Sequence, residues 1–181
     1  AHTARPWMGV NAIHRLGAIF EILNQYEERR PVIEGCQYRE ALQAVRVEGG
    51  IAGNVVPDTT SLTINHRFAP DRNIDEAENY VRGLFAPVLN SSDTLSLVDS
   101  APPAKPGLSN PVLAAMIGRY DLEVQGKLGW TDVAFFDQRG IPAANFGPGD
   151  ATLAHTRDER VTKTAVDSCF LVLKNLMESG L

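Results

Sequence analysis

The sequence predicts an α+β fold in two parts, and two observations carry this prediction. In the first hundred residues, segments with helical and strand periodicity follow one another in the order helix, strand, strand, helix, strand. A Pro-rich stretch then leads into a second part, where helices alternate with short apolar segments as in an α/β protein. With 44% apolar residues among 181, the chain can bury one good core or two small ones.

The first helix and the two strands after it are defined by their apolar spacing. Asn11 is placed to cap a helix that runs to about Tyr26, because apolar side chains recur there every three or four residues. Residues 42–48 read as a strand, and 61–68 alternate strictly between two faces, with His66 among the packing residues. We therefore expect the two strands to pair as antiparallel neighbours.

A second helix and a third strand close the first part. Asn73 and Glu76 form the pattern of a capping box at the start of that helix, and residues 94–98 read as a short strand. The resulting order is that of a split-βαβ sandwich without its first strand. A missing strand would leave a sheet edge unpaired, so we expect a truncated chain; the alternative is a smaller α+β unit that needs no such strand.

Residues 101–107, which include three prolines, form the clearest linker in the sequence. A stiff, extended connection of this kind marks a domain boundary. Beyond it the sequence predicts a helix that Ser109 and Pro111 open and that runs to about Tyr120, followed by a strand over 124–128. A helix ended by Gly140 and an apolar strand over 141–146 come next. The last predicted element is a helix over 164–179 with Gly180 as its cap.

The last helix carries an apolar face that we expect to be buried. The residues of this face, at helical spacing, are Val166, Cys169, Phe170, Leu173, Leu176 and Met177. Core packing is therefore the expected role of Cys169, which lies far from Cys36 in the sequence and forms no CxxC pair with it. Two such cysteines suit a reducing cytoplasm.

Charge and hydropathy argue against several classes of protein. The chain holds 17 basic and 22 acidic residues, whereas nucleic-acid and anionic-membrane surfaces need clustered Lys and Arg. No apolar run approaches the roughly 18 residues of a membrane span, and no signal-peptide pattern is present. We expect a cytoplasmic protein that contacts neither nucleic acid nor membrane.

The clearest candidate for chemistry is a single histidine, His155, near the end of the chain. An apolar run over 141–146 meets the Gly/Pro turn 147–149, and His155 follows, with Asp158 and Glu159 close behind. Strand ends in α/β proteins hold their loops rigidly, which makes His155 a candidate metal ligand or acid–base group. Judged by itself, a loop histidine is more often simply solvated.

Four motifs together resemble those of the dinuclear-zinc aminoacylase and carboxypeptidase family. They occur in the family's order, cover essentially the whole chain, and read AHTARPWMGVNAIH, GGIAGNVVPDTTSLTINHRFAPDR, GWTDVAFF and GIPAANFGPGDATLAHTRDERV. In that family an α/β zinc-peptidase catalytic domain carries an inserted lid, a split-βαβ, ferredoxin-like sandwich with an antiparallel sheet, which makes the dimer. The resemblance implies a lid and dimerisation domain over 1–100, a linker over 101–107, and the C-terminal part of the catalytic domain over 108–181.

The resemblance also implies a reaction. Within the family, the motifs are most similar to those of enzymes that hydrolyse N-succinyl-LL-2,6-diaminopimelate to succinate and LL-2,6-diaminopimelate, on the path to lysine. Such enzymes are homodimers that use zinc-activated water, with two Zn²⁺ per subunit for which Co²⁺ can substitute. The family's HxD motif and most of its zinc ligands are absent from this sequence, so the chain alone is expected to be inactive. Two alternatives stay open: a dimerisation or binding module without catalysis, and a sibling N-acyl amino acid amidohydrolase such as acetylornithine deacetylase.

Two histidines take roles from the resemblance. His155 matches the family's carboxy-terminal zinc ligand, and Asp158 or Glu159 could orient its second ring nitrogen, unless both carboxylates are merely solvated. His2 matches the lid histidine that reaches the other subunit's active site and stabilises the oxyanion of the tetrahedral intermediate. Without the resemblance, His2 would be a residue of a frayed terminus.

Substrate contacts are implied at two further places. Asn54 and Arg67 match positions that bind the substrate's carboxylates, although a turn residue and an ordinary exposed strand charge are the simpler interpretations. Gly129, Trp130 and Thr131 match a substrate-contacting loop, although the family often has a small residue where Trp130 stands. Thr131 is equally placed to cap the helix that follows.

Overall fold

The structure, a computed structural model, describes residues 1–180 and divides into two compact units. The first unit consists of Ala1–Ile33 and Gln37–Pro103, and the second of Glu34–Cys36 and the residues from Ala104 onward. The change from one unit to the other therefore falls inside the Pro-rich segment.

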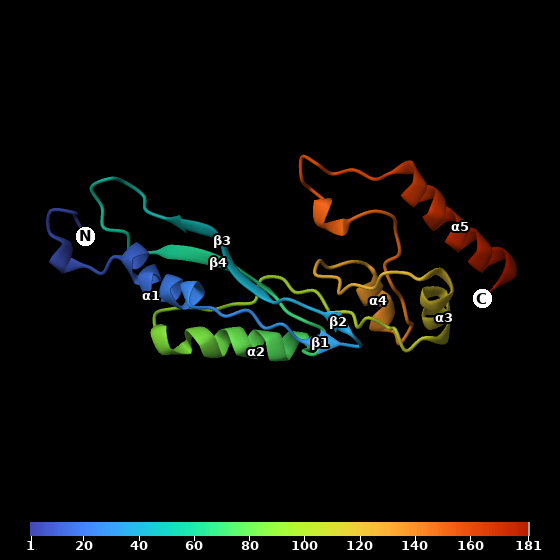
Figure 1. Ribbon diagram of the computed structural model, residues 1–181. Helices are drawn as coiled ribbons and strands as arrows, with labels where there is room; N and C mark the ends of the chain where they lie inside the picture. The colour runs from blue at the N-terminus through green and yellow to red at the C-terminus, as the bar shows by residue number, and fades with distance from the viewer. Residues whose placement is uncertain (181) are drawn as a thin grey trace. The chain divides into compact units, whose positions relative to one another are not determined.

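Helices account for most of the regular structure, as Figure 1 shows. In chain order the elements are η1 (Pro6–Met8), α1 (Ala12–Asn24), β1 (Val32–Ile33), β2 (Cys36–Gln37), β3 (Ala41–Gly49), β4 (Thr60–Arg67), α2 (Ile74–Phe85), η2 (Ala86–Val88), α3 (Pro111–Tyr120), α4 (Val133–Asp137), η3 (Ala151–Leu153) and α5 (Lys163–Ser179). None of the helices in the described part of the chain is long and apolar enough to cross a membrane.

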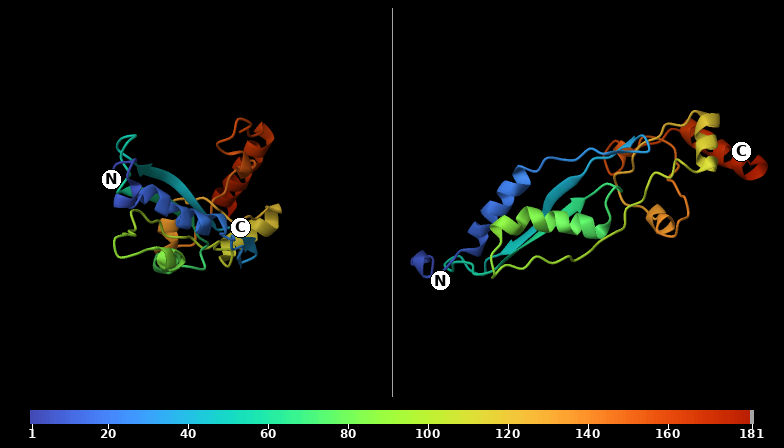
Figure 2. Two further views of the ribbon diagram at one scale, coloured as in Figure 1. Left: turned by 90° about the vertical axis from the view of Figure 1, so that its left-hand side faces the viewer. Right: turned by 90° about the horizontal axis from the view of Figure 1, so that it is seen from below.

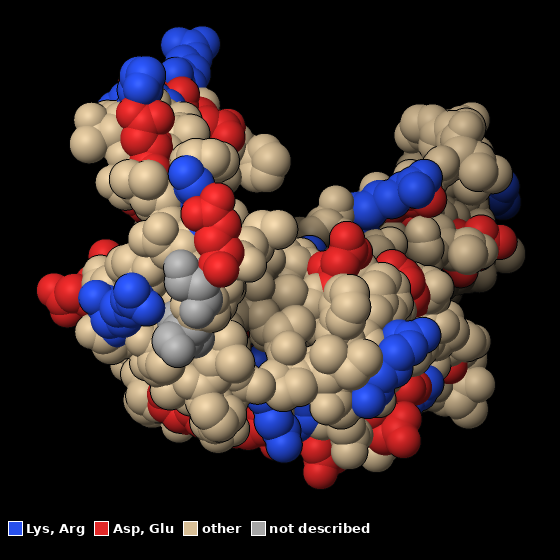
Figure 3. Space-filling view, turned by 90° about the vertical axis from the view of Figure 1, so that its right-hand side faces the viewer, with Lys and Arg blue, Asp and Glu red and all other residues tan. Residues whose placement is uncertain are grey.

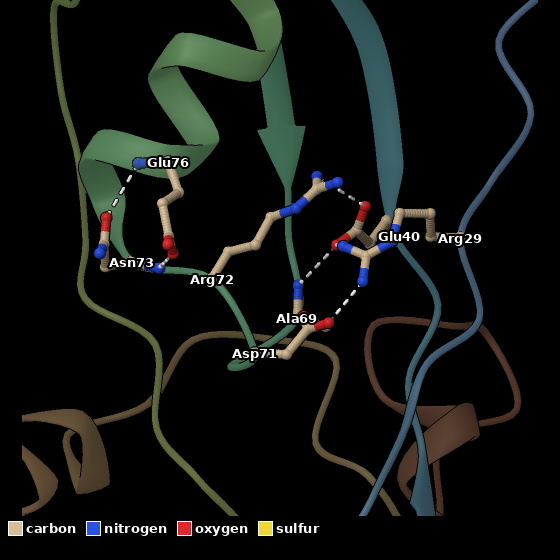
Figure 4. Close-up of polar contacts among 7 residues, drawn as sticks. All are labelled: Arg29, Glu40, Ala69, Asp71, Arg72, Asn73 and Glu76. Carbon is tan, nitrogen blue, oxygen red and sulfur yellow. Dashed lines mark hydrogen bonds and ion pairs between the residues drawn. The ribbon is translucent and has the colours of Figure 1, made fainter.

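The two helices of the first unit begin at the caps that the sequence predicts. Asn11 Oδ1 accepts a hydrogen bond from the backbone N–H of His14 at 3.2 Å and opens α1. At α2, Asn73 Oδ1 accepts from Glu76 N–H at 2.9 Å while the Glu76 carboxylate accepts from Asn73 N–H at 2.8 Å (Figure 4). Both backbone donors are thereby satisfied, and the predicted capping box is confirmed.

β3 and β4 form the predicted antiparallel pair. Their register runs from Ala41 opposite Arg67 to Gly49 opposite Thr60, with an irregularity between Ala44 and Arg46. The side chains of β4 alternate between exposed and half-buried, as expected for a strand with one packed face. α1 packs against both strands and against α2, and Figure 2 shows the two helices side by side. The predicted α+β class and antiparallel sheet of the first unit are confirmed.

The buried residues of the first unit lie between these helices and strands. They are Leu16, Tyr38, Leu42, Val56, Ala69, Ala77 and Phe85, together with one charged side chain, Glu40. Leu42 and Phe85 are each only 1% exposed, so the centre of the core excludes solvent.

The predicted strand over 94–98 is wrong. These residues form no strand, and Leu97 and Val98 are 50% and 82% exposed. A strand exists only beside a partner, and in a split-βαβ sandwich the last strand pairs with the first, which is not found among the described residues. A hairpin that the sequence analysis did not predict forms instead between β1 and β2, turning through Glu34 and Gly35, both at positive φ.

The second unit consists of helices joined by irregular segments. α3 is capped by Asn110, whose Oδ1 accepts from Val112 and Leu113 N–H, rather than by Ser109. α5 begins at the cap of Thr162 and ends at Gly180, whose φ of 66° suits a glycine.

Neither of the strands predicted in the second unit is formed. Residues 124–128 and 141–146 are irregular, and Ile141 is 49% exposed rather than buried. Parallel strands are stabilised by neighbours on either side, and between residues 104 and 180 no strand is present to supply the ladder. The prediction that a buried strand precedes His155 is therefore wrong.

The face of α5 predicted to be buried is only partly so. One stripe at heptad-like spacing, formed by Ala165, Cys169, Val172 and Leu176, is buried or half-buried. The neighbouring stripe is exposed, and its members are Val166 (42%), Phe170 (63%), Leu173 (42%) and Met177 (86%). We call these four residues the α5 stripe. α5 therefore has two adjacent apolar stripes, of which one is packed against other residues and the α5 stripe is not.

Candidate functional site

The first residues of the chain form a short strap over the β3–β4 connection. Residues 1–4, which we call the N-terminal strap, run antiparallel to residues 54–56. Thr3 N–H donates to Asn54 O at 3.0 Å, and Val56 N–H donates to Ala1 O at 2.7 Å. These two bonds flank a bridge between His2 and Val55, so the terminus is tied down rather than frayed.

His2 is exposed, but its ring is hydrogen-bonded. Nδ1 accepts from the backbone N–H of Ala4 at 3.0 Å, and the His2 carbonyl accepts from Arg5 N–H at 2.8 Å, which closes a turn. The Asn54 side chain is also exposed, and makes no hydrogen bond within the described residues. The strap therefore brings together two of the predicted site residues, His2 and Asn54, on adjacent backbone segments.

Arg67 lies apart from this pair. It is the last residue of β4, exposed and opposite Ala41, whereas the His2–Asn54 segments lie beyond Thr60 at the other end of the hairpin (Figure 1). β4 spans roughly 24 Å from Thr60 to Arg67, at about 3.4 Å per residue. Within one chain, the structure does not bring Arg67 to His2.

The loop at Gly129, Trp130 and Thr131 is exposed and held from two sides. The Trp130 ring packs edge-to-face on Phe135, with ring centroids 5.3 Å apart. Thr131 Oγ1 accepts from Asn145 Nδ2 at 3.0 Å, which ties this loop to the segment leading toward His155. The alternative role of Thr131 as a helix cap is wrong, because α4 is preceded by Asp132 and has no side-chain cap.

His155 sits in a turn after η3, with an exposed side chain and a backbone φ of 65°. Its N–H donates to the Glu159 carboxylate at 2.9 Å. Glu159 therefore holds the backbone of the turn and does not orient the imidazole. No described residue hydrogen-bonds to the ring, which leaves both of its nitrogens open to a ligand.

The described residues form no metal site on their own. No three His, Cys, Asp or Glu side chains gather closely enough to hold an ion in the part of the chain that the structure describes. A zinc site needs three or four such ligands, so His155 can be at most one ligand of a site completed by other groups. This chain alone does not fit the two zinc ions of the related family.

A buried carboxylate that the sequence analysis did not predict anchors the start of β3. Glu40 accepts from Arg29 Nη1 at 2.8 Å, from Arg72 Nη1 at 3.3 Å and from Ala69 N–H at 3.2 Å (Figure 4). Arg29 also pairs with Asp71. The cluster ties the end of the segment after α1 to the loop between β4 and α2.

Two aromatic polar groups lie close to this carboxylate. The His66 ring packs against Phe68 and Tyr80, at centroid distances of 5.7 and 5.6 Å, which confirms its predicted role in packing. Burial lowers the pKa of His66, although the charge of Glu40 acts in the opposite direction. Burial likewise raises the pKa of Tyr26, whose hydroxyl, like His66 Nε2, has no hydrogen-bond partner within the described residues.

The second unit also contains an apolar hollow of about 520 Å³ beside α5. Its wall includes Phe146, Pro148, Cys169 and Val172, and both cysteines of the chain are free thiols. Figure 3 shows that positive and negative side chains are interspersed over this side of the molecule. Among the described residues that line it, the titratable side chains are Tyr120 and Cys169 alone, so its surface is suited to packing rather than to chemistry.

Fold and site together define an α+β domain that presents a fixed histidine at one end, with no complete catalytic site among the described residues. A family model described as the peptidase dimerisation domain (M20_dimer) matches residues 1–92. The chain belongs to this family.

Curated relatives extend the match beyond that domain. The chain is 51% identical over 162 residues to a Mycobacterium tuberculosis (strain CDC 1551 / Oshkosh) protein named "Putative succinyl-diaminopimelate desuccinylase DapE", covering 89% of this chain and 45% of that protein. It is 38% identical over 180 residues to the succinyl-diaminopimelate desuccinylase of Corynebacterium glutamicum, covering 98% and 48%. A LysW-lysine/LysW-ornithine hydrolase of Saccharolobus islandicus (strain L.S.2.15) is 26% identical over 136 residues, covering 72% and 37%.

The relationship predicted from the four motifs is confirmed by these matches. The chain is related to succinyl-diaminopimelate desuccinylases and contains a peptidase dimerisation domain. It spans about half the length of the desuccinylases it matches, at 45% and 48%.

Proposed function

We propose that this chain is part of a zinc-dependent amidohydrolase that hydrolyses N-succinyl-LL-2,6-diaminopimelate to succinate and LL-2,6-diaminopimelate, in the cytoplasm. The observation that carries the proposal is the joined pair His2 and Asn54. Two residues assigned to one active site from separate motifs are held together by backbone hydrogen bonds. The 51% identity to a protein named for this reaction supports the same substrate.

The two units take different parts in the proposed enzyme. Residues 1–100 are the dimerisation lid, 101–107 the linker, and 108–181 the C-terminal part of the catalytic domain. Two features of the second unit support its role: segments 124–128 and 141–146 have the composition of strands without a ladder, and the α5 stripe is uncovered. A sheet completed by further polypeptide would pair the segments and cover the stripe.

Each predicted site residue has a proposed task. His2 donates a hydrogen bond to the oxyanion that forms at the amide carbon, in the active site of the other subunit. Asn54 and Arg67 bind carboxylates of the substrate, and the guanidinium of Arg67 is suited to a bidentate contact. Gly129, Trp130 and Thr131 line the substrate site. His155 is one zinc ligand, and polypeptide beyond this sequence supplies the others.

The length of the hairpin supports a site built from two copies. Because roughly 24 Å of β4 separates Arg67 from the His2–Asn54 end, a small tricarboxylate such as N-succinyl-LL-2,6-diaminopimelate cannot touch both within one chain. In a two-fold dimer of antiparallel lids, the His2 end of one copy lies near the Arg67 end of the other. A homodimer through the lid therefore allows all three residues to reach one substrate.

Substitutions in a full-length relative test this proposal. His155→Ala should remove the binding of one zinc ion, and metal analysis that still finds two per subunit would contradict its role. His2→Ala should lower turnover far more than zinc content, because the side chain contacts the substrate and not the metal. His14→Ala is the matched control, since His14 is an exposed histidine on α1.

Two alternatives remain, and each has its own assay. The chain could serve as a dimerisation or binding module without catalysis, which the absence of a metal cluster among the described residues favours. Turnover by the 181-residue chain with zinc would exclude that function. A sibling enzyme acting on another N-acyl amino acid, such as acetylornithine, is favoured by the similarity to a LysW-lysine hydrolase. Comparing succinyl and acetyl substrates on the full-length enzyme separates these two.

A further inference from the structure

The N-terminal strap fixes more than the position of His2. The backbone N–H of Ala4 donates to His2 Nδ1 at 3.0 Å, so Nδ1 must keep its lone pair. A neutral imidazole carries its proton on one ring nitrogen only, and that nitrogen is then Nε2. We propose that the backbone N–H of Ala4 is a positioning group that holds His2 as the Nε2–H tautomer and presents Nε2–H, on the far side of the ring, as a hydrogen-bond donor.

The backbone around His2 is fixed on both sides, which makes this tautomer a property of the fold. Val56, only 6% exposed, holds the residue before His2 through the bond to Ala1 O, and Asn54 O holds Thr3 N–H after it. Arg5 N–H closes the turn on the His2 carbonyl at 2.8 Å. With the main chain held in this way, the ring has two torsions left, and the bond from Ala4 restrains both.

The tautomer decides what the ring can do. A donor at Nε2 can stabilise negative charge that develops on an oxygen, whereas the other tautomer would turn a lone pair toward that oxygen. An acceptor in the wrong place would repel the charge and would have to rearrange before reaction. The use of the donor on an oxyanion rests on the proposed function, but the tautomer itself does not.

Nitrogen NMR on the 181-residue chain tests the tautomer directly. At about pH 8, ¹⁵N-labelled side chains report which nitrogen of each ring carries hydrogen. The His2 signals are assigned by their loss in His2→Gln. His14 is the internal reference, since its side chain is exposed and has no hydrogen bond within the described residues. One hydrogen bond should depress the Nδ1–H form of His2 about fivefold relative to His14.

A change confined to one atom tests the role of Ala4. Replacing Ala4 by lactic acid exchanges its N–H for an ester oxygen and keeps the methyl group, so the tautomer ratio of His2 should return to that of His14. Ala4→Gly keeps the N–H and should leave the ratio as it is. Equal ratios for His2 and His14 in the unmodified chain, or a ratio that the ester does not alter, would overturn the inference.

Two controls keep this result separate from the fate of the proposed function. Hydrogen exchange at Val56 N–H shows whether the ester has loosened the strap. If it has, the tautomer of His2 is judged from the unmodified chain alone, by comparing its ratio with that of His14. Turnover of His2→Ala in a full-length relative tests the function independently. If His2 is mainly the Nε2–H tautomer but His2→Ala keeps its turnover, the inference stands and the oxyanion role is excluded. If His2→Ala loses turnover but His2 and His14 have equal tautomer ratios, the inference is overturned and the oxyanion role stands.

Discussion

Glu40 combines a charge with complete burial, and its side chain has no exposed surface. Three donors compensate for its desolvation: two guanidinium groups and the N–H of Ala69. Such a carboxylate makes a large difference to stability because removing its charge leaves Arg29 and Arg72 with a weaker partner in the same place.

We expect Glu40→Gln to lower the free energy of unfolding by about 1–3 kcal/mol, measured by urea denaturation. The arginines are partly exposed, which keeps the loss below that of a fully buried pair. Glu48→Gln is the control: Glu48 pairs with Arg46 on the surface, and its loss should stay within about 0.5 kcal/mol. Equal losses for the two variants would show that the buried cluster adds nothing.

His66 links stability to pH through its burial. Because its pKa is lowered in the fold, the unfolded chain takes up a proton at a pH where the folded chain does not. The contribution of His66 to the free energy of unfolding is therefore fully present above the unfolded pKa of about 6.5. It declines as pH falls from there toward the lowered pKa of the folded state.

We expect His66→Phe to remove this part of the pH dependence while keeping the ring contacts with Phe68 and Tyr80. The measurement is the free energy of unfolding as a function of pH in both proteins, whose difference isolates His66 from the carboxylates. His14→Gln is the matched control, since His14 is an exposed histidine on α1. A difference curve that is flat below about pH 6.5 would contradict the assignment.

Single residues differed in how far the sequence could predict them. The proposed roles of His2 and Asn54 come from motifs, since each stands in a recognisable string of residues, and they stay predictions. The acceptor role of Glu40 was not predicted, because its three donors come from positions 29, 69 and 72, and no local pattern joins them. The bond from Ala4 to the His2 ring is local, since the two residues are only two positions apart, but no residue pattern in the sequence announces it.

Secondary-structure elements were predicted well where their signals are local. The caps at Asn11 and Asn73 and the alternation of β4 depend on neighbouring residues, and all three are confirmed. The strands over 124–128 and 141–146 were wrong because a strand depends on a ladder that its own sequence does not encode. The hairpin β1–β2 was missed for a related reason, since each strand has only two residues.

The capping box of α2 gives a prediction at this scale. Asn73→Ala should lower the free energy of unfolding by about 1 kcal/mol, because two backbone N–H groups lose their acceptors or the geometry that supports them. Thermal or urea unfolding measures the loss. Asn73→Ser keeps an acceptor oxygen at the cap and should recover most of the stability, and a Ser variant as unstable as the Ala variant would argue against the cap as the cause.

At the scale of the whole molecule, many large apolar side chains among the described residues are exposed. The α5 stripe carries Phe170 at 63% and Met177 at 86% exposure, and large exposed patches promote association. We expect the isolated chain to self-associate, and the double variant Phe170→Gln with Met177→Gln to weaken this, measured by sedimentation velocity. Lys174→Gln, on the same helix but outside the stripe, is the control. A clean monomer for the unmodified chain would contradict the prediction.

The separation of His2 from Arg67 along the hairpin yields a test of the assembly. If each active site of a full-length relative takes Arg67 from one copy and His2 from the other, then His2→Ala and Arg67→Ala are each inactive as homodimers. In a mixed dimer, one site receives both changes and the other receives neither. Random exchange makes half of the dimers mixed, so mixing the two inactive variants should restore about a quarter of the original activity.

Enzyme assays before and after subunit exchange measure that recovery. A tag on one of the two variants lets native mass spectrometry resolve the mixed dimer and measure how completely the subunits exchange. No recovery on mixing, with exchange shown to be complete, would mean that His2 and Arg67 serve a site within one copy. The roughly 24 Å span of β4 would then have to be closed by a change in the hairpin itself, which its paired register from Ala41 to Gly49 opposes.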